Sequence, residues 1–212
     1  MSEIKEKTFS SFESIQEVCR IFDYDYEMKP FIEEKFFKIN EYLESSLREE
    51  FNDDKNMVNE FVICEALLRP ILSAVARENK IPLWSHIKFE YDKSVGLSGE
   101  ADYFLAPKEK GTFSTPILCV AEAKKENFTK GWAQVAAEMI ASQKKNKDSE
   151  TIIYGLVSTG EIWKFAKLKG SFFTIDPNSH AAPAEFQKIF NILNWMFCEA
   201  RKNADILIEK NK

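Results

Sequence analysis

Two stretches decide the fold: VGLSGEADYFLA at residues 95–106 and PILCVAEAK at residues 116–124. The second is a run of apolar residues that ends in charge, which indicates a buried strand with a polar end. In the first, Glu100 and Asp102 are two residues apart and therefore point to the same face of a strand. Glu122 and Lys124 are related in the same way. Because an unpaired buried charge is costly, these groups need a compensating partner.

A divalent cation held by Asp102 and Glu122 is one such partner. Magnesium prefers hard oxygen ligands and keeps several waters, so two carboxylates and one backbone carbonyl suffice to hold it. The alternative is a structural cluster of ion pairs that joins Asp102, Glu122 and Lys124 at the strand end. The spacing of the residues leaves both interpretations open.

The rest of the chain predicts an α/β fold with a mixed sheet flanked by helices. Helical spacing is expected at residues 12–22, 30–51, 57–77, 128–145 and 186–208, and Pro70 kinks or splits the third of these helices. Besides the two quoted stretches, strands are expected at 87–92, 151–158, 161–168 and 171–175. We expect a helical extension over residues 1–54 and an α/β domain over residues 55–212.

Composition excludes several classes of protein. With 44% hydrophobic and 30% charged residues, the chain is neither disordered nor collagen-like. It has no apolar run of about 20 residues and no signal-peptide pattern, so we expect a cytoplasmic protein without a membrane span. Four scattered cysteines and two histidines do not predict a zinc site.

Charge is distributed unevenly. The net charge is −5, and residues 1–60 alone carry −8, so the remainder carries +3 and can face a polyanion. The acidic N-terminal helices offer a surface for a second copy of the chain or for a separate partner subunit.

The order of the polar residues resembles the PD-(D/E)xK nuclease superfamily. The similarity is greatest to the N-terminal nuclease domain of type I restriction enzyme R subunits. Asp102 is followed twenty residues later by Glu122-Ala123-Lys124, and GEADYFLA resembles the GxxDY strand of that domain. Ala101 stands where the nominal motif has proline.

Two helical features extend the resemblance. Glu60 precedes Pro70 by ten residues, as in the first core helix of the family, with Glu65 as the alternative to Glu60. Gln134 follows Lys124 by ten residues and resembles a glutamine motif in a subset of these nucleases. The resemblance covers about residues 57–170.

The resemblance implies a restriction-endonuclease-like fold and Mg²⁺-dependent (or Mn²⁺-dependent) hydrolysis of DNA phosphodiester bonds. It implies that Asp102, Glu122 and the carbonyl of Ala123 hold the metal. Glu60 would hold a metal-bound water or a second metal. Lys124 would orient or deprotonate the attacking water and neutralise developing charge. Gln134 would position the substrate or the lysine.

DNA contacts are expected after the motif, because phosphate charge dominates the affinity for nucleic acids. The candidates are Lys125, Lys130 and Trp132, followed by the lysines at positions 144, 145 and 147. Trp132 stacks on a base in this interpretation, but its helical spacing with Val135 and Met139 more often indicates a core residue. The alternative function is a catalytically inactive nucleic-acid-binding or partner-binding protein on the same fold. An accessory subunit with a separately encoded motor is the third hypothesis.

Overall fold

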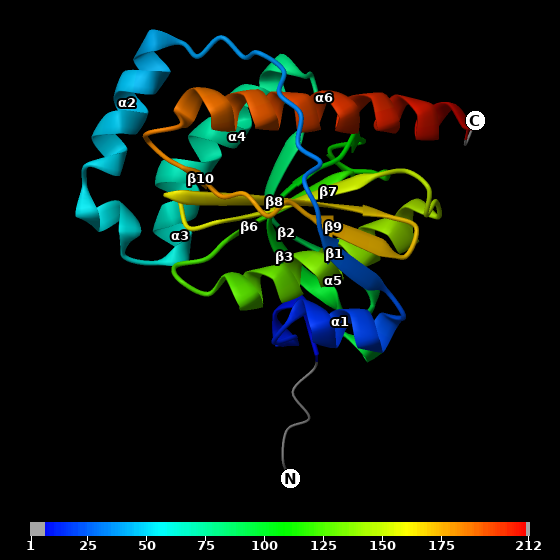
Figure 1. Ribbon diagram of the computed structural model, residues 1–212. Helices are drawn as coiled ribbons and strands as arrows, with labels where there is room; N and C mark the ends of the chain where they lie inside the picture. Colours follow the sequence, from blue (N-terminus) through cyan, green and yellow to red (C-terminus); the bar gives the residue numbers. More distant parts are fainter. Residues whose placement is uncertain (1–6, 211–212) are drawn as a thin grey trace.

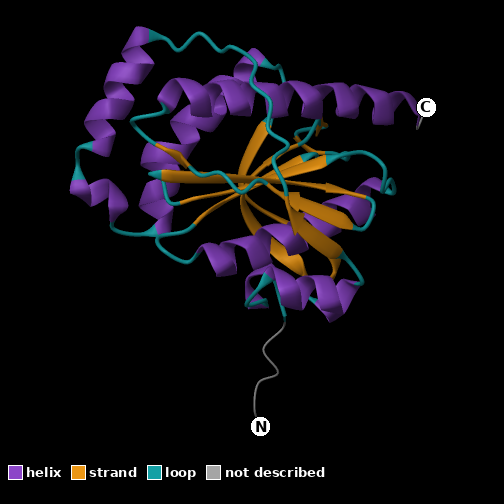
Figure 2. Ribbon diagram, in the orientation of Figure 1, coloured by secondary structure: helices purple, strands orange, loops and turns teal. Residues whose placement is uncertain are grey.

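A twisted mixed sheet lies between two layers of helices in the computed structural model, which describes residues 7–210 (Figures 1 and 2). The strands follow the order β1-β9-β8-β7-β6-β3-β2, and β10 pairs with β8. β6 runs parallel to β7 and β1 runs parallel to β9, whereas the other neighbours are antiparallel. The bounds are β1 (Asp25–Met28), β2 (Leu83–Asp92), β3 (Leu97–Leu105), β6 (Cys119–Ala123), β7 (Ile153–Ser158), β8 (Ile162–Lys169), β9 (Phe172–Ile175) and β10 (His180–Ala181). A separate hairpin joins β4 (Lys108–Glu109) and β5 (Thr112–Phe113).

Helices cover both faces of the sheet. One face carries η1 (Phe9–Ser11), α1 (Ile15–Phe22) and α5 (Phe128–Asn146). The other carries α3 (Glu60–Ile63), the π-helical turn η3 (Cys64–Leu68), α4 (Arg69–Glu78) and α6 (Phe186–Lys210). Two further elements, α2 (Glu41–Phe51) and η2 (Asp54–Met57), adjoin this second layer, and η4 (Lys93–Val95) links β2 to β3. The expected mixed sheet flanked by helices is therefore confirmed.

Close packing fixes α5 on the sheet. A Cβ atom on Gly155 of β7 would lie 2.6 Å from the Met139 sulfur and 2.8 Å from Val135 Cγ1. Glycine at this position therefore lets the helix approach the strand more closely than any other residue would. None of the helices in the described part of the chain has the length and apolar surface of a membrane span.

Pro70 does not end its helix. It is the second residue of α4, and the turn before it widens into η3, where the Arg69 N–H donates to the Cys64 carbonyl five residues back. Proline lacks the N–H for the usual bond to Ala66, and its ring clashes with that carbonyl in a regular helix. The π-helical turn avoids this clash, and the helical segment continues without a break from α3 through η3 into α4.

Two expectations for the N-terminal segment are wrong. The helix expected over residues 30–51 begins only at Glu41, and residues 25–28 form the edge strand β1, so the extension is not purely helical. The Phe31 N–H donates to Asp176 Oδ2 at 3.1 Å, and the Phe37 N–H donates to Asn191 Oδ1 at 3.0 Å. These long-range partners satisfy backbone groups that a helix would otherwise pair. The boundary at residue 54 stays a prediction.

Candidate active site

The candidate site lies where β3 and β6 diverge. Their ladder ends at the pair Tyr103–Ala121, and side chains then take over the hydrogen bonding. Asp102 Oδ2 accepts from the Ala123 N–H at 2.8 Å, and Glu122 Oε1 accepts from the Asp102 N–H at 3.1 Å. Each carboxylate thus binds the backbone of the opposite strand. The structure brings Asp102 and Glu122 together, as their positions in the sequence predicted.

Lys124 lies between two carboxylates from different elements. Its Nζ atom is 3.3 Å from Glu122 Oε2 and 3.4 Å from Glu60 Oε2, and the residue is only 8% exposed. Burial alone would lower the pKa of this ammonium, but the charges of Glu122 and Glu60 outweigh it and raise the pKa above its ordinary value. Lys124 is therefore protonated at neutral pH.

Glu60, and not Glu65, meets the lysine. Glu60 is the first residue of α3, whose N-cap is Asn59, and its Oε1 atom also accepts from the Lys125 N–H at 3.4 Å. Glu65 lies in the next helical element, η3, and forms an ion pair with Arg69 at 2.7 Å. The sequence left open whether Glu60 or Glu65 belongs to the site, and the start of α3 at Glu60 decides this.

Gly131 lets α5 pack directly against Lys124. A Cβ atom at this position would lie 2.9 Å from Lys124 Cγ and 2.6 Å from Val157 Cγ1. Real Cβ contacts are longer than this, so any larger residue would displace the lysine or the helix. The stem of Lys124 is thus held between β6 and the first turns of α5.

Glu138 is the functional candidate that the sequence interpretation missed. It is fully buried on α5, and its Oε1 atom accepts a hydrogen bond from Gln134 Nε2 at 3.1 Å. Burial raises the pKa of Glu138 to about 8, and burial with the charges of Glu138 and Asp102 raises the pKa of Glu122 well above its ordinary value. Burial thus favours the protonated, uncharged form of each carboxyl.

Gln134 reaches the site through Glu138. Its side-chain amide donates to Glu138, no hydrogen bond joins it to Lys124 in the described residues, and it is only 7% exposed. The spacing of four residues along α5 was the available signal, because residues i and i+4 share a helix face. Glutamate is common on helices, so Glu138 could not be distinguished from an ordinary helical residue by this spacing alone.

His86 adds a second unforeseen group. It stands opposite Asp102 between the paired positions of β2 and β3, with a left-handed φ of 51°. Its Nδ1 atom lies 3.9 Å from Asp102 Oδ1 and 3.7 Å from Glu100 Oε1, and its Nε2 atom lies 3.6 Å from Glu65 Oε1. These distances are too long for hydrogen bonds. A non-glycine residue in this conformation stores strain, which tends to occur at functional sites.

The donor set fits a hard divalent cation. Within residues 7–210 no three His, Cys, Asp or Glu side chains form a ready-made metal cluster. The expected set has only two such side chains, Asp102 and Glu122, with the carbonyl of Ala123. Glu138 Oε2 is buried and has no hydrogen-bond partner in the described structure. One ammonium therefore faces several carboxylates, and a divalent cation would offset the excess negative charge.

The expected DNA-contacting residues have different surroundings. Lys125 is exposed, whereas Lys130 Nζ lies 3.2 Å from Glu13 Oε1. Trp132 is 9% exposed and belongs to the core under α5. Lys144 and Lys145 contact β2 through Tyr91 and Glu90, at the opposite end of α5 and about 20 Å along its axis from Lys130. Lys125 is thus the candidate next to Glu60 whose side chain forms no ion pair with any residue that the structure describes.

Comparison of the chain with protein-family models and with curated proteins finds no match. The resemblance to the PD-(D/E)xK nucleases therefore stays a prediction.

Proposed function

We propose that the protein is a nuclease that uses Mg²⁺, or Mn²⁺, to hydrolyse DNA phosphodiester bonds on a restriction-endonuclease-like fold. The observation that carries the proposal is the convergence of Asp102, Glu122, Lys124 and Glu60 at one end of the sheet. Glu60 comes from α3 and Asp102 from β3, whereas Glu122 and Lys124 come from the end of β6 and the residue that follows it.

Asp102, Glu122 and the Ala123 carbonyl would hold the metal ion. When bound, the ion supplies a Lewis acid for the phosphate and lowers the pKa of a coordinated water. Lys124 stabilises the negative charge that develops on the phosphate, because its raised pKa keeps the ammonium charged. Of the two roles expected for this lysine, the structure therefore favours electrostatic stabilisation over deprotonation of water.

The open side of the site is formed by Asp102 and Glu60. Their side chains are 22% and 50% exposed, whereas Glu122 is fully buried. A DNA backbone would approach along this side, next to the exposed Lys125. Glu60 holds the Lys124 ammonium toward the same opening.

The test compares the wild type with Asp102→Ala and Lys124→Met on duplex, single-stranded and branched DNA, with Mg²⁺, Mn²⁺ or EDTA. We expect metal-dependent cleavage that falls at least about a hundredfold in both variants, since loss of one charge-stabilising group has that effect. Glu126→Gln, an exposed residue two positions beyond Lys124, is the matched control. Equal cleavage by the wild type and Lys124→Met would refute the proposal.

The second candidate is a catalytically inactive nucleic-acid-binding or partner-binding protein. The complete burial of Glu122 and the raised pKa values of Glu122 and Glu138 favour it, because a buried acid that keeps its proton carries no charge for a metal to offset. Calorimetric titration with Mn²⁺ separates the two. Binding that is lost in Asp102→Ala supports the nuclease, and no binding in the wild type supports the alternative.

A further inference from the structure

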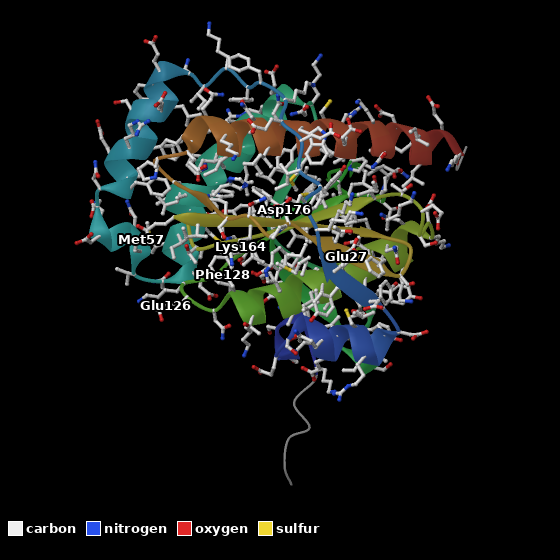
Figure 3. All side chains as sticks on the ribbon, viewed as in Figure 1. Glu27, Met57, Glu126, Phe128, Lys164 and Asp176 are labelled. Carbon is white, nitrogen blue, oxygen red and sulfur yellow. The ribbon has the colours of Figure 1, made fainter. Side chains whose placement is uncertain are left out.

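A cavity of about 390 Å³ opens between α1, the first turns of α5 and the strands β1, β8 and β9. Figure 3 labels Phe128, Lys164 and Asp176, which lie around it. Most of its lining is apolar or aromatic: Ile15, Tyr26, Met28, Phe128, Trp132 and Ile175. Its size is that of a small-molecule site.

Among the described residues that line the cavity, Lys164 is the one cation. Asp176 lines it too, but its carboxylate oxygens already accept from the Phe31 N–H and from Asn178. Lys164 forms no ion pair with any residue from 7 to 210, and its Nζ atom lies 4.6 Å from the centroid of the Phe128 ring. The combination of aromatic walls and an unpaired ammonium fits a planar base that carries a phosphate.

The sheet register links the cavity to the candidate site. Glu122 of β6 pairs with Val157 of β7, and Val157 pairs with Lys164 of β8. Paired residues point to the same face of a sheet, so Lys164 projects from the same row and the same face as Glu122. Neighbouring strands are about 4.8 Å apart, so the two backbones are about 10 Å apart.

We propose that this cavity binds the base of an unpaired nucleotide in the strand that is cut, with Lys164 on its phosphate. The inference rests on the proposed nuclease function and narrows its substrate class. A base in a duplex is paired and stacked, so entering the cavity costs free energy that a single strand does not lose. The preferred substrate is therefore DNA with unpaired nucleotides near the cleaved bond, such as a single strand or a flap.

Binding without cleavage tests the cavity independently. Fluorescein-labelled oligonucleotides, one a single-stranded 20-mer of thymidine and one a duplex, are titrated by anisotropy in EDTA. We expect the single strand to bind at least about tenfold more tightly. Phe128→Ala and Lys164→Gln should each weaken single-strand binding about tenfold, the size of one lost base-stacking or phosphate contact, and leave duplex binding unchanged.

Lys167→Gln is the matched control. Lys167 lies on the same strand and over a phenylalanine ring at 4.8 Å, but that ring is Phe31, which packs on the opposite face of the sheet. A control variant that weakens binding as much as Lys164→Gln overturns the proposal, since the effect is then one of general charge. Thermal melting of each variant identifies any loss of folding.

The outcomes separate the two proposals. Equal affinity for the two oligonucleotides, or no effect of either cavity variant, refutes the base site even if Lys124-dependent cleavage is present. Selective single-strand binding through Phe128 and Lys164 without any cleavage supports the base site and refutes the nuclease. Free adenosine monophosphate is added as a competitor at the nucleotide concentration of the oligonucleotide. If it displaces the oligonucleotide, the cavity binds a free nucleotide, and the proposal that it binds a DNA strand is refuted.

Discussion

Replacement of Glu138 by glutamine tests the central electrostatic feature of the site. Glu138 is fully buried beside Glu122, and its pKa is raised from 4.5 to about 8, first of all by burial. The amide of glutamine has the same shape and can donate to Glu122 as the protonated acid does. Glu138→Gln therefore removes the ionisation and keeps the packing.

The sign of the effect follows from proton binding. In the unfolded chain Glu138 loses its proton near pH 4.5, whereas in the folded chain it keeps it to about pH 8. The folded state binds more protons in this window, so the free energy of unfolding of the wild type falls as pH rises. The rise in pKa corresponds to roughly 5 kcal/mol at most, because each pKa unit is worth about 1.36 kcal/mol.

Urea denaturation in EDTA from pH 5 to pH 9 measures this difference. We expect wild type and Glu138→Gln to be similarly stable at pH 5, and the variant to be more stable by several kcal/mol at pH 9. Glu126→Gln, which changes an exposed glutamate, should follow the wild type at every pH. If the stability of Glu138→Gln falls with pH as steeply as that of the wild type, the proton is not held at Glu138.

Three further predictions concern packing and strain. Gly131→Ala should lower the free energy of unfolding by about 1–3 kcal/mol, because its Cβ atom meets Val157 and Lys124, and should reduce cleavage by folded protein; unchanged activity in an assay corrected for folded fraction would contradict this. His86→Val should be about 1–2 kcal/mol less stable than His86→Asn, since asparagine tolerates a φ of 51° and valine does not; equal melting temperatures would show that the strain is absent. Trp132→Ala should cost about 3–5 kcal/mol in urea denaturation, as expected for a buried tryptophan, whereas a loss below about 1 kcal/mol would place its ring outside the core.

Much of the sheet could be predicted because strand signals are local. The apolar run before Glu122 forms β6, and the alternation in residues 161–168 forms β8, close to the expected bounds. For residues 30–40 the same use of local patterns predicted a helix that the structure does not contain. Their helical spacing is real, but side chains from the loop after β9 and from α6 form hydrogen bonds with the backbone of this segment and hold it in an irregular conformation. Local propensity is a weak prior that such tertiary contacts override.

The sequence by itself determined that Glu122 and Lys124 share a face at one strand end. Its helical repeat also places Gln134 and Glu138 on one helix face, although nothing in that repeat marks Glu138 as a site residue. These relations depend only on the repeat of the backbone, which is two residues in a strand and 3.6 in a helix. Only the tertiary structure decided that Glu60 and not Glu65 meets the lysine, that the charge of buried Glu138 acts on Glu122, and that His86 stands beside Asp102. Those neighbours belong to separate elements, and their distances are set by how closely the helices pack on the sheet, which no local pattern encodes.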